Sequence, residues 1–136
     1  MRRKLSFSLA ALMLLALASC RAKPPKVVRW VAPVYPMIAR MAHVEGVVTA
    51  TVEISSDGKV SNAKATSGPA LIVLRQECLA SARKWLFATS SKPTRRANLS
   101  FEFTIDDALG KDALPKVSFS PPYHVAIRVA PIYLES

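Results

Sequence analysis

The chain has 136 residues, a formal net charge of +10, a hydrophobic fraction of 51% and a charged fraction of 21%. This composition is typical of a globular protein and excludes a disordered or collagen-like chain. The basic excess suits contact with an anionic lipid or glycan surface, or simply keeps an exposed domain soluble, and no run of aromatics interleaved with arginines indicates nucleic-acid binding.

The first twenty residues, MRRKLSFSLAALMLLALASC, have the plan of an export signal. Three basic residues precede an apolar stretch that is shorter than the ~20 residues a membrane-spanning helix needs. Leu17-Ala18-Ser19-Cys20 resembles a bacterial lipobox, in which the cysteine becomes the lipid-bearing first residue. We therefore expect a lipoprotein signal peptide over residues 1–19 and lipidation of Cys20. A short uncleaved anchor helix is the alternative.

Residues 20–34 contain three prolines and several basic side chains, which predicts an extended tether whose apolar second half packs on the domain. Residues 35–46 follow as a short helix, with Pro36 in its first turn and Ile38, Met41 and Ala42 on one face. The predicted helix ends at Gly46, where an extended segment begins.

Two strands and a tight turn are predicted next. Residues 47–54 alternate between apolar and polar side chains, as a half-buried strand does. The turn signal SSDG at residues 55–58 and the return segment of residues 59–66 complete a hairpin.

Residues 67–87 have the pattern of a longer helix, with Ser67 as a candidate N-cap. Its apolar stripe holds Leu71, Leu74, Cys78, Ala82 and Trp85. If Cys20 carries lipid, Cys78 has no disulfide partner, and its place in the stripe predicts a buried, inert thiol.

Residues 97–105, ANLSFEFTI, give the clearest strand pattern, with every second side chain apolar. The order helix–strand–strand–helix–strand predicts an α+β domain over residues 35–105, in which a small antiparallel three-stranded sheet packs against two helices. Residues 106–136 form a C-terminal extension. The alternating stretch HVAIRV predicts a further strand there, with Val125, Ile127 and Val129 on one side.

The usual signatures of an active site are missing from the sequence. His43 and His124 are the two histidines, and neither stands at metal-ligand spacing from cysteine or carboxylate. There is no glycine-rich phosphate loop and no nucleophile elbow. The adjacent pair Asp106-Asp107 lies in a predicted loop, where carboxylates are usually solvated. We expect no enzyme activity, no cofactor and no metal.

Four short motifs occur in sequence order: Tyr35-Pro36, Glu45-Gly46, Asp57-Gly58 and Trp85-x-Phe87. The alternating strand follows them. Over roughly residues 33–105 the sequence resembles the C-terminal domain of TonB-type energy transducers. This resemblance implies a domain whose last strand lies at a sheet edge. A segment of an outer-membrane receptor, the TonB box, adds to that edge as a further strand.

The resemblance also implies a set of partner-binding residues. They are Tyr35, Pro36, Ala97, Asn98, Leu99, Ser100, Phe101, Glu102, Phe103, Thr104 and Ile105. For Tyr35 and Pro36, capping and packing of the short helix is an equally good interpretation. The expected partner is a TonB-dependent receptor or another envelope protein, and pairing of exposed edges leaves a homodimer open.

Two of the departures from the family's pattern bear on force transmission, which in the family depends on a histidine-bearing membrane helix and a long spacer. No histidine precedes His43, and the long Pro-rich spacer of the transducers is replaced by a short tether, which argues against force transmission. The sequence therefore predicts a non-enzymatic binding module that is lipid-anchored and faces the periplasm. Arg21, rather than an aspartate, follows the cysteine, which favours the outer membrane.

Three alternatives stay open. The first alternative is a structural envelope lipoprotein whose basic surface binds peptidoglycan or anionic lipid. The second is a transducer with an uncleaved anchor. In addition, HVAIRV can pair with the strand of residues 97–105 within the chain, as a TonB box does between chains.

Overall fold

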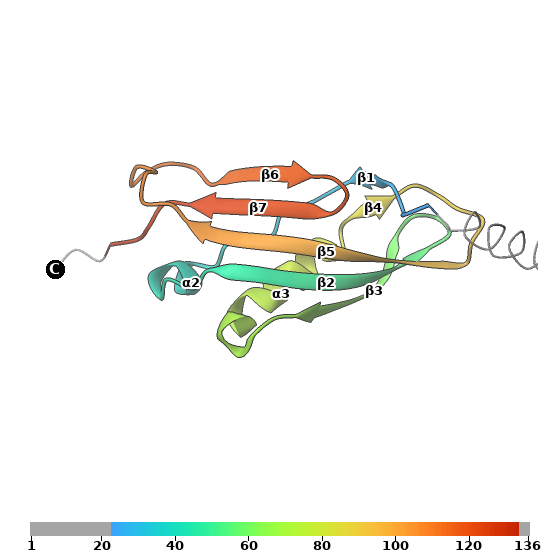
Figure 1. Cartoon of the computed structure of the whole chain (residues 1–136), viewed down its shortest axis with the longest axis horizontal. Coiled ribbons are helices and arrows are strands. Elements are labelled where there is room, and N and C mark those ends of the chain that lie inside the picture. Colours follow the sequence, from blue (N-terminus) through green and yellow to red (C-terminus); the bar gives the residue numbers. More distant parts are fainter. Residues whose placement is uncertain (1–22, 134–136) are drawn as a thin grey trace, which may run out of the picture.

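The computed structural model describes residues 23–133, so the predicted signal peptide and Cys20 lie outside the described residues. A five-stranded sheet with the order β3–β2–β5–β7–β6 forms its centre (Figure 1). The strands are β2 (Gly46–Ser55), β3 (Val60–Thr66), β5 (Thr94–Ile105), β6 (Lys116–Ser120) and β7 (His124–Val129). A separate two-stranded ribbon pairs β1 (Val27–Arg29) with β4 (Leu86–Phe87).

The β2–β3 hairpin forms as the alternation predicts. Val48, Ala50, Val52 and Ile54 on β2 are fully buried. Gly58 in the turn has φ +89°, and a Cβ at this position would lie 2.0 Å from the carbonyl oxygen of Phe87. Only glycine combines this backbone conformation with such a close approach.

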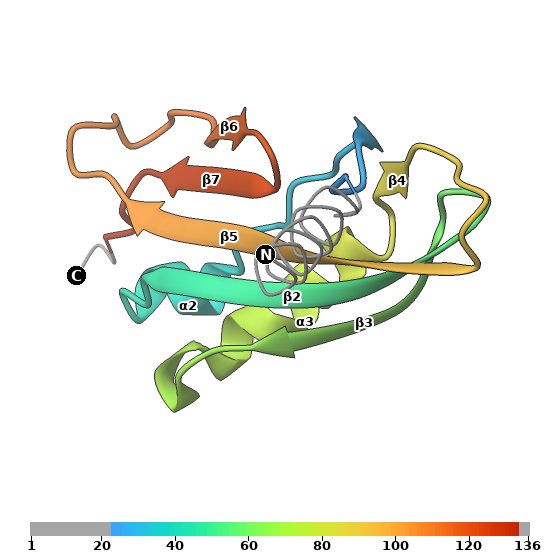
Figure 2. The same ribbon diagram turned by 45° about the vertical axis from the view of Figure 1, so that its right-hand side comes forward.

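The predicted long helix divides into a 3₁₀ turn, η1 (Pro69–Leu71), and the helix α3 (Ile72–Ala82), which packs on β2 and β3 (Figure 2). Leu74, Cys78 and Ala82 lie fully buried on its inner face, so the predicted stripe and the buried thiol are confirmed. The predicted N-cap is wrong. The Ser67 hydroxyl instead accepts a hydrogen bond from Arg75 Nε at 2.7 Å.

The short helix α2 (Met37–Met41) is present, but the face that Ile38, Met41 and Ala42 were expected to share does not pack on the core. Ile38 and Met41 are 67% and 42% exposed, whereas Ala39 is buried. A helix of five residues presents only about one side chain to the core, and Tyr35, just before it, fills the adjoining space. The apolar residues of α2 therefore remain at the surface.

The sheet corrects the predicted fold in strand number and strand direction. The α+β class with two helices is confirmed, but the sheet has five strands rather than three, and it is mixed rather than antiparallel. β5 pairs antiparallel with β2 from Thr94 to Phe103 and parallel with β7 from Ser100 to Ile105. The predicted strand HVAIRV is confirmed as β7, and β6, which pairs with it, is an additional strand.

The C-terminal extension and the N-terminal segment both contribute to the core. Val125, Ile127 and Val129 of β7 are at most 1% exposed. From the N-terminal side, the carbonyl oxygen of Val31 accepts a hydrogen bond from Trp85 Nε1 at 2.9 Å. The Trp30 ring stacks on Phe119 of β6 with a centroid distance of 5.4 Å. The described parts of both segments, within residues 23–34 and 106–133, thus pack on the domain.

Candidate functional site

β5 has a different neighbour in each half of its length. Ser100 N–H donates to the carbonyl oxygen of Tyr123 at 2.9 Å, and Asp106 N–H donates to that of Val129 at 2.8 Å. The even-numbered residues of β5 therefore direct their N–H and C=O groups toward β7. This alternation extends to Arg96 and Asn98, because backbone direction repeats every second residue along a strand.

β7 begins too late to cover those residues. Its first residue, His124, stands opposite Ser100. Within residues 23–133, Thr94–Leu99 therefore has β2 on one side and no sheet neighbour on the other. We call Thr94–Leu99 the open edge. The expectation that the whole segment 97–105 is a sheet edge is wrong for Ser100–Ile105, because β7 pairs with that half in cis, and it holds only for the first three residues.

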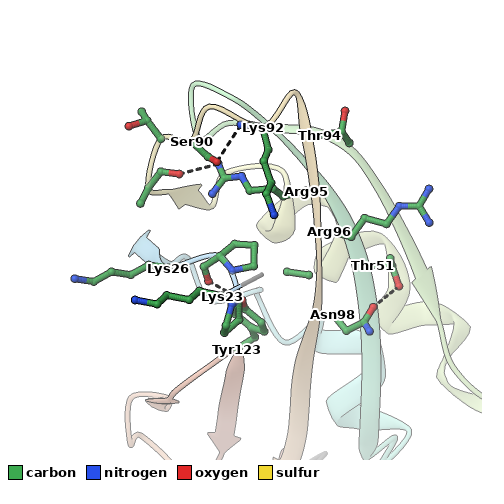
Figure 3. Close-up of a pocket in the computed structure, with 15 residues that line it drawn as sticks. Lys23, Lys26, Thr51, Ser90, Lys92, Thr94, Arg95, Arg96, Asn98 and Tyr123 are labelled. Atoms are coloured by element: carbon green, nitrogen blue, oxygen red, sulfur yellow. Dashed lines mark hydrogen bonds between the residues drawn. The ribbon is translucent and has the colours of Figure 1, made fainter. Parts of the chain in front are cut away.

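A hollow of about 1160 Å³ runs along the open edge (Figure 3). In this view Lys23, Lys26 and Tyr123 lie on one side of the β5 ribbon, whereas Thr51, Arg96 and Asn98 lie on the other. The residues that line the hollow are Lys23, Pro24, Pro25, Lys26, Thr51, Ala88, Thr89, Ser90, Lys92, Thr94, Arg95, Arg96, Ala97, Asn98 and Tyr123. We call this hollow the basic groove. Its volume exceeds the roughly 300–1,000 Å³ of a small-molecule pocket and is ample for an extended peptide.

Hydrogen bonds from three parts of the chain hold the walls of the groove. The Tyr123 hydroxyl donates to the carbonyl oxygen of Pro25 at 2.6 Å and so joins the C-terminal extension to the N-terminal segment. Burial raises the pKa of Tyr123, which keeps this donor protonated. The Arg95 guanidinium donates to the carbonyl oxygens of Ala88 at 2.7 Å and Ser55 at 3.3 Å.

The covered half of β5 is held to β7 by side chains as well as by its backbone. His124 Nδ1 lies 3.1 Å from Ser100 Oγ, and His124 Nε2 lies 3.1 Å from Glu102 Oε2. Thr104 and Ile105 stand opposite Arg128 and Val129. Ser100 and Glu102, both expected to bind a partner, therefore make side-chain contacts with His124 of the same chain.

Phe101 and Phe103, the other predicted residues of this half, are buried in the core. Tyr35 packs beneath them, 7% exposed, with its ring edge-on to Phe103 at 5.1 Å between centroids. Its hydroxyl donates to the carbonyl oxygen of Val44, and burial raises the pKa of Tyr35 to about 12. Tyr35 and the half-buried Pro36 thus lie by the covered half, away from the basic groove.

Of the predicted partner-binding residues, Ala97 and Asn98 line the groove, and Leu99 is buried at the end of the open edge. The sequence patterns did not indicate the cationic side chains around the basic groove, although two of them, Arg95 and Arg96, lie on β5 itself. The pair Arg95-Arg96 directly before the predicted strand was a usable signal. No such signal pointed to Lys23 or Lys26, because their proximity depends on the path of the chain.

The described residues 23–133 contain no group of three His, Cys, Asp or Glu side chains that could hold a metal ion. In the same part of the chain, none of the helices has the length and apolar character needed to cross a membrane.

A family profile for the C-terminal region of Gram-negative bacterial TonB proteins matches residues 31–106, more than half of the chain. No curated protein shows a significant match. Among solved structures, the solution NMR structure of the Pseudomonas aeruginosa TonB C-terminal domain is similar at 25% identity with a TM-score of 0.49. That similarity covers 61% of this chain and 88% of the Pseudomonas chain.

Proposed function

The chain belongs to the TonB C-terminal family, and from this membership we propose that it binds extended segments of envelope proteins by adding them to its sheet as a strand. Domains of this family are non-enzymatic protein-interaction modules of the periplasm, and they interact with TonB-dependent receptors and other envelope proteins. A receptor plug segment is the partner that we propose here.

The open edge is the proposed place of addition. Arg96 and Asn98 carry backbone N–H and C=O groups on a side of β5 where β7 does not reach, and this single observation carries the proposal. Unpaired strand edges supply the backbone hydrogen bonds of strand addition, and alternate side chains supply selectivity. Ala97, Asn98 and Leu99 remain as proposed partner-binding residues, whereas Ser100–Ile105 bind a partner only if β7 leaves.

We further propose that the module is a lipoprotein. Residues 1–19 would be its signal peptide, Cys20 the lipidated residue and residues 20–34 the tether, followed by the domain of residues 35–105 and the extension of residues 106–136. The anchor would hold the domain on the periplasmic face of the outer membrane. Metabolic labelling with palmitate tests this, because a Cys20→Ser variant should lose the label.

Photocrosslinking in cells tests the proposed strand addition. A crosslinker placed at Asn98 should react with an extended segment of an envelope protein, which mass spectrometry identifies. A crosslinker at Ser100 is the matched control and should react with the chain's own residues near His124. If the Asn98 probe reacts only with residues of the same chain, or only with lipid or glycan, strand addition at the open edge is wrong.

A second function has support from the basic groove: a structural lipoprotein that holds anionic lipid or cell-wall glycan. Binding of this kind should weaken steeply with salt, whereas strand addition depends mainly on backbone hydrogen bonds. A transducer with an uncleaved anchor is the third candidate. It requires that the chain in cells retain Met1, which N-terminal peptide mapping measures directly.

A further inference from the structure

The basic groove has a one-sided charge. Among the described residues that line it, five are cationic, namely Lys23, Lys26, Lys92, Arg95 and Arg96, and none is Asp or Glu. The cations come from separate parts of the chain: the N-terminal segment, the loop before β5, and β5 itself. Figure 3 shows them on both sides of the β5 ribbon.

Little of this charge is neutralised within the described residues. Arg96 contacts Glu53 at 3.3 Å, but its side chain is 74% exposed, and an exposed pair of this kind contributes little. Arg95 donates from Nη2 to two carbonyl oxygens, and these neutral acceptors do not cancel its charge. Lys23, Lys26 and Lys92 form no ion pair with a carboxylate of residues 23–133.

The open edge and the cations together specify the ligand more closely than either does alone. The free backbone groups of Arg96 and Asn98 require an extended peptide backbone. The surrounding cations require negative charge on that peptide, and charge complementarity of this kind increases association rates and discriminates against basic segments. A phosphate headgroup would satisfy the cations but would leave the strand edge unpaired.

We propose that the segment which adds to the open edge is acidic, with carboxylate side chains at alternating positions along an extended strand. This inference rests on the proposed strand addition and names the class of its partner. Alternating side chains of an added strand point to opposite faces of the sheet. The carboxylate set would face Arg95 and the wall that carries Lys23 and Lys26, and the intervening side chains would lie beside Arg96 on the outer face.

Binding of synthetic peptides to the full-length chain in neutral detergent tests the proposal. The probe is a fluorescent peptide of about seven residues in which Glu alternates with Val, a length that suits an ordinary strand. A peptide with Gln in place of Glu has the same shape without the charge. Fluorescence anisotropy should show that the Gln peptide binds about tenfold more weakly, because several weak ion pairs are lost together.

Variants of the chain assign this preference to the groove. Lys92→Glu and the double change Lys23→Glu with Lys26→Glu should each reduce the affinity for the Glu peptide several-fold and leave that for the Gln peptide nearly unchanged. Lys64→Glu is the matched control, because Lys64 is exposed on β3, outside the groove. Equal binding of the Glu and Gln peptides would overturn the acidic preference while leaving strand addition intact.

Strand addition itself is tested separately. Asn98→Pro removes an N–H on the open side, whereas Asn98→Ala keeps it, so the first change should abolish binding of both peptides and the second should not. A Glu peptide N-methylated at alternate residues repeats this test without altering the protein. If the methylated peptide binds as well as the parent, or vesicles containing phosphatidylglycerol displace both, the groove is an anionic-surface site and both proposals fail.

Discussion

At the scale of single residues, burial decides what each side chain can do. Cys78 has no exposed surface on the inner side of α3, and burial raises the pKa of its thiol to about 12. The reactive thiolate is therefore scarce near neutral pH. In a Cys20→Ser variant, we predict that a thiol reagent at about pH 8 labels Cys78 only after denaturation. Rapid labelling of the native protein would contradict the buried position.

Gly58 shows how a single residue fixes the hairpin. Its φ of +89° and the carbonyl oxygen of Phe87 leave no room for a side chain. We predict that Gly58→Ala lowers the free energy of unfolding by more than ~1 kcal/mol. Urea denaturation measures the change, with Gly110→Ala as the control, because no heavy atom lies within 4 Å of a Cβ built there. Similar losses for both variants would contradict the steric account.

At the scale of elements, β7 is part of the core and not an appendage. Ile127 is 1% exposed on β7, whereas Leu114, in the loop before β6, is 83% exposed. We predict that Ile127→Ala lowers the free energy of unfolding by about 2–4 kcal/mol, because it leaves a cavity, and that Leu114→Ala changes it by less than ~0.5 kcal/mol. Chemical denaturation gives both values. A small effect of Ile127→Ala would mean that β7 is not packed as described.

The loop that leads away from β5 gives the stability of the domain a pH dependence. The backbone N–H of Ala108 and the Arg128 guanidinium hold the pKa of the Asp106 carboxyl below its ordinary value. A carboxyl with a lowered folded-state pKa stabilises the fold above its unfolded pKa of about 4, and this contribution is lost as the pH falls through the folded value. Below about pH 4, the melting temperature should therefore fall more steeply for the wild type than for Asp106→Asn. If the melting temperatures of the two proteins fall equally with pH, Asp106 does not have this role.

The elements also show how far the sequence predicts the fold. Alternation predicted β2, β5 and β7, and helical spacing predicted the buried stripe of α3, because these signals are local. The sequence left open whether β7 pairs with β5. Alternation within a strand shows which side chains are buried, but it does not determine which strands become neighbours in the sheet. β6 was missed because only Phe119 in it is even partly buried. The open edge was predicted only in its last three residues, because its limits depend on where β7 begins.

At the scale of the whole molecule, the chain itself covers only one half of the edge of β5 that faces away from β2. β7 covers Ser100–Ile105, and the open edge faces a groove with five cations. In the proposed function, the open edge is a short strand-addition surface surrounded by cations. Under that proposal, β7 protects half of an aggregation-prone edge, and the cations restrict the other half to a charge-matched segment.

Amide hydrogen exchange along β5 is the measurement that tests this division most directly. NMR spectra of the partner-free protein in deuterated buffer report each amide separately. We predict that the amides of Arg96 and Asn98 exchange rapidly, because their N–H groups face the groove, whereas those of Ser100, Glu102 and Thr104 are protected by β7. Equal and strong protection of all five amides would contradict an open edge and, with it, the proposed site of strand addition.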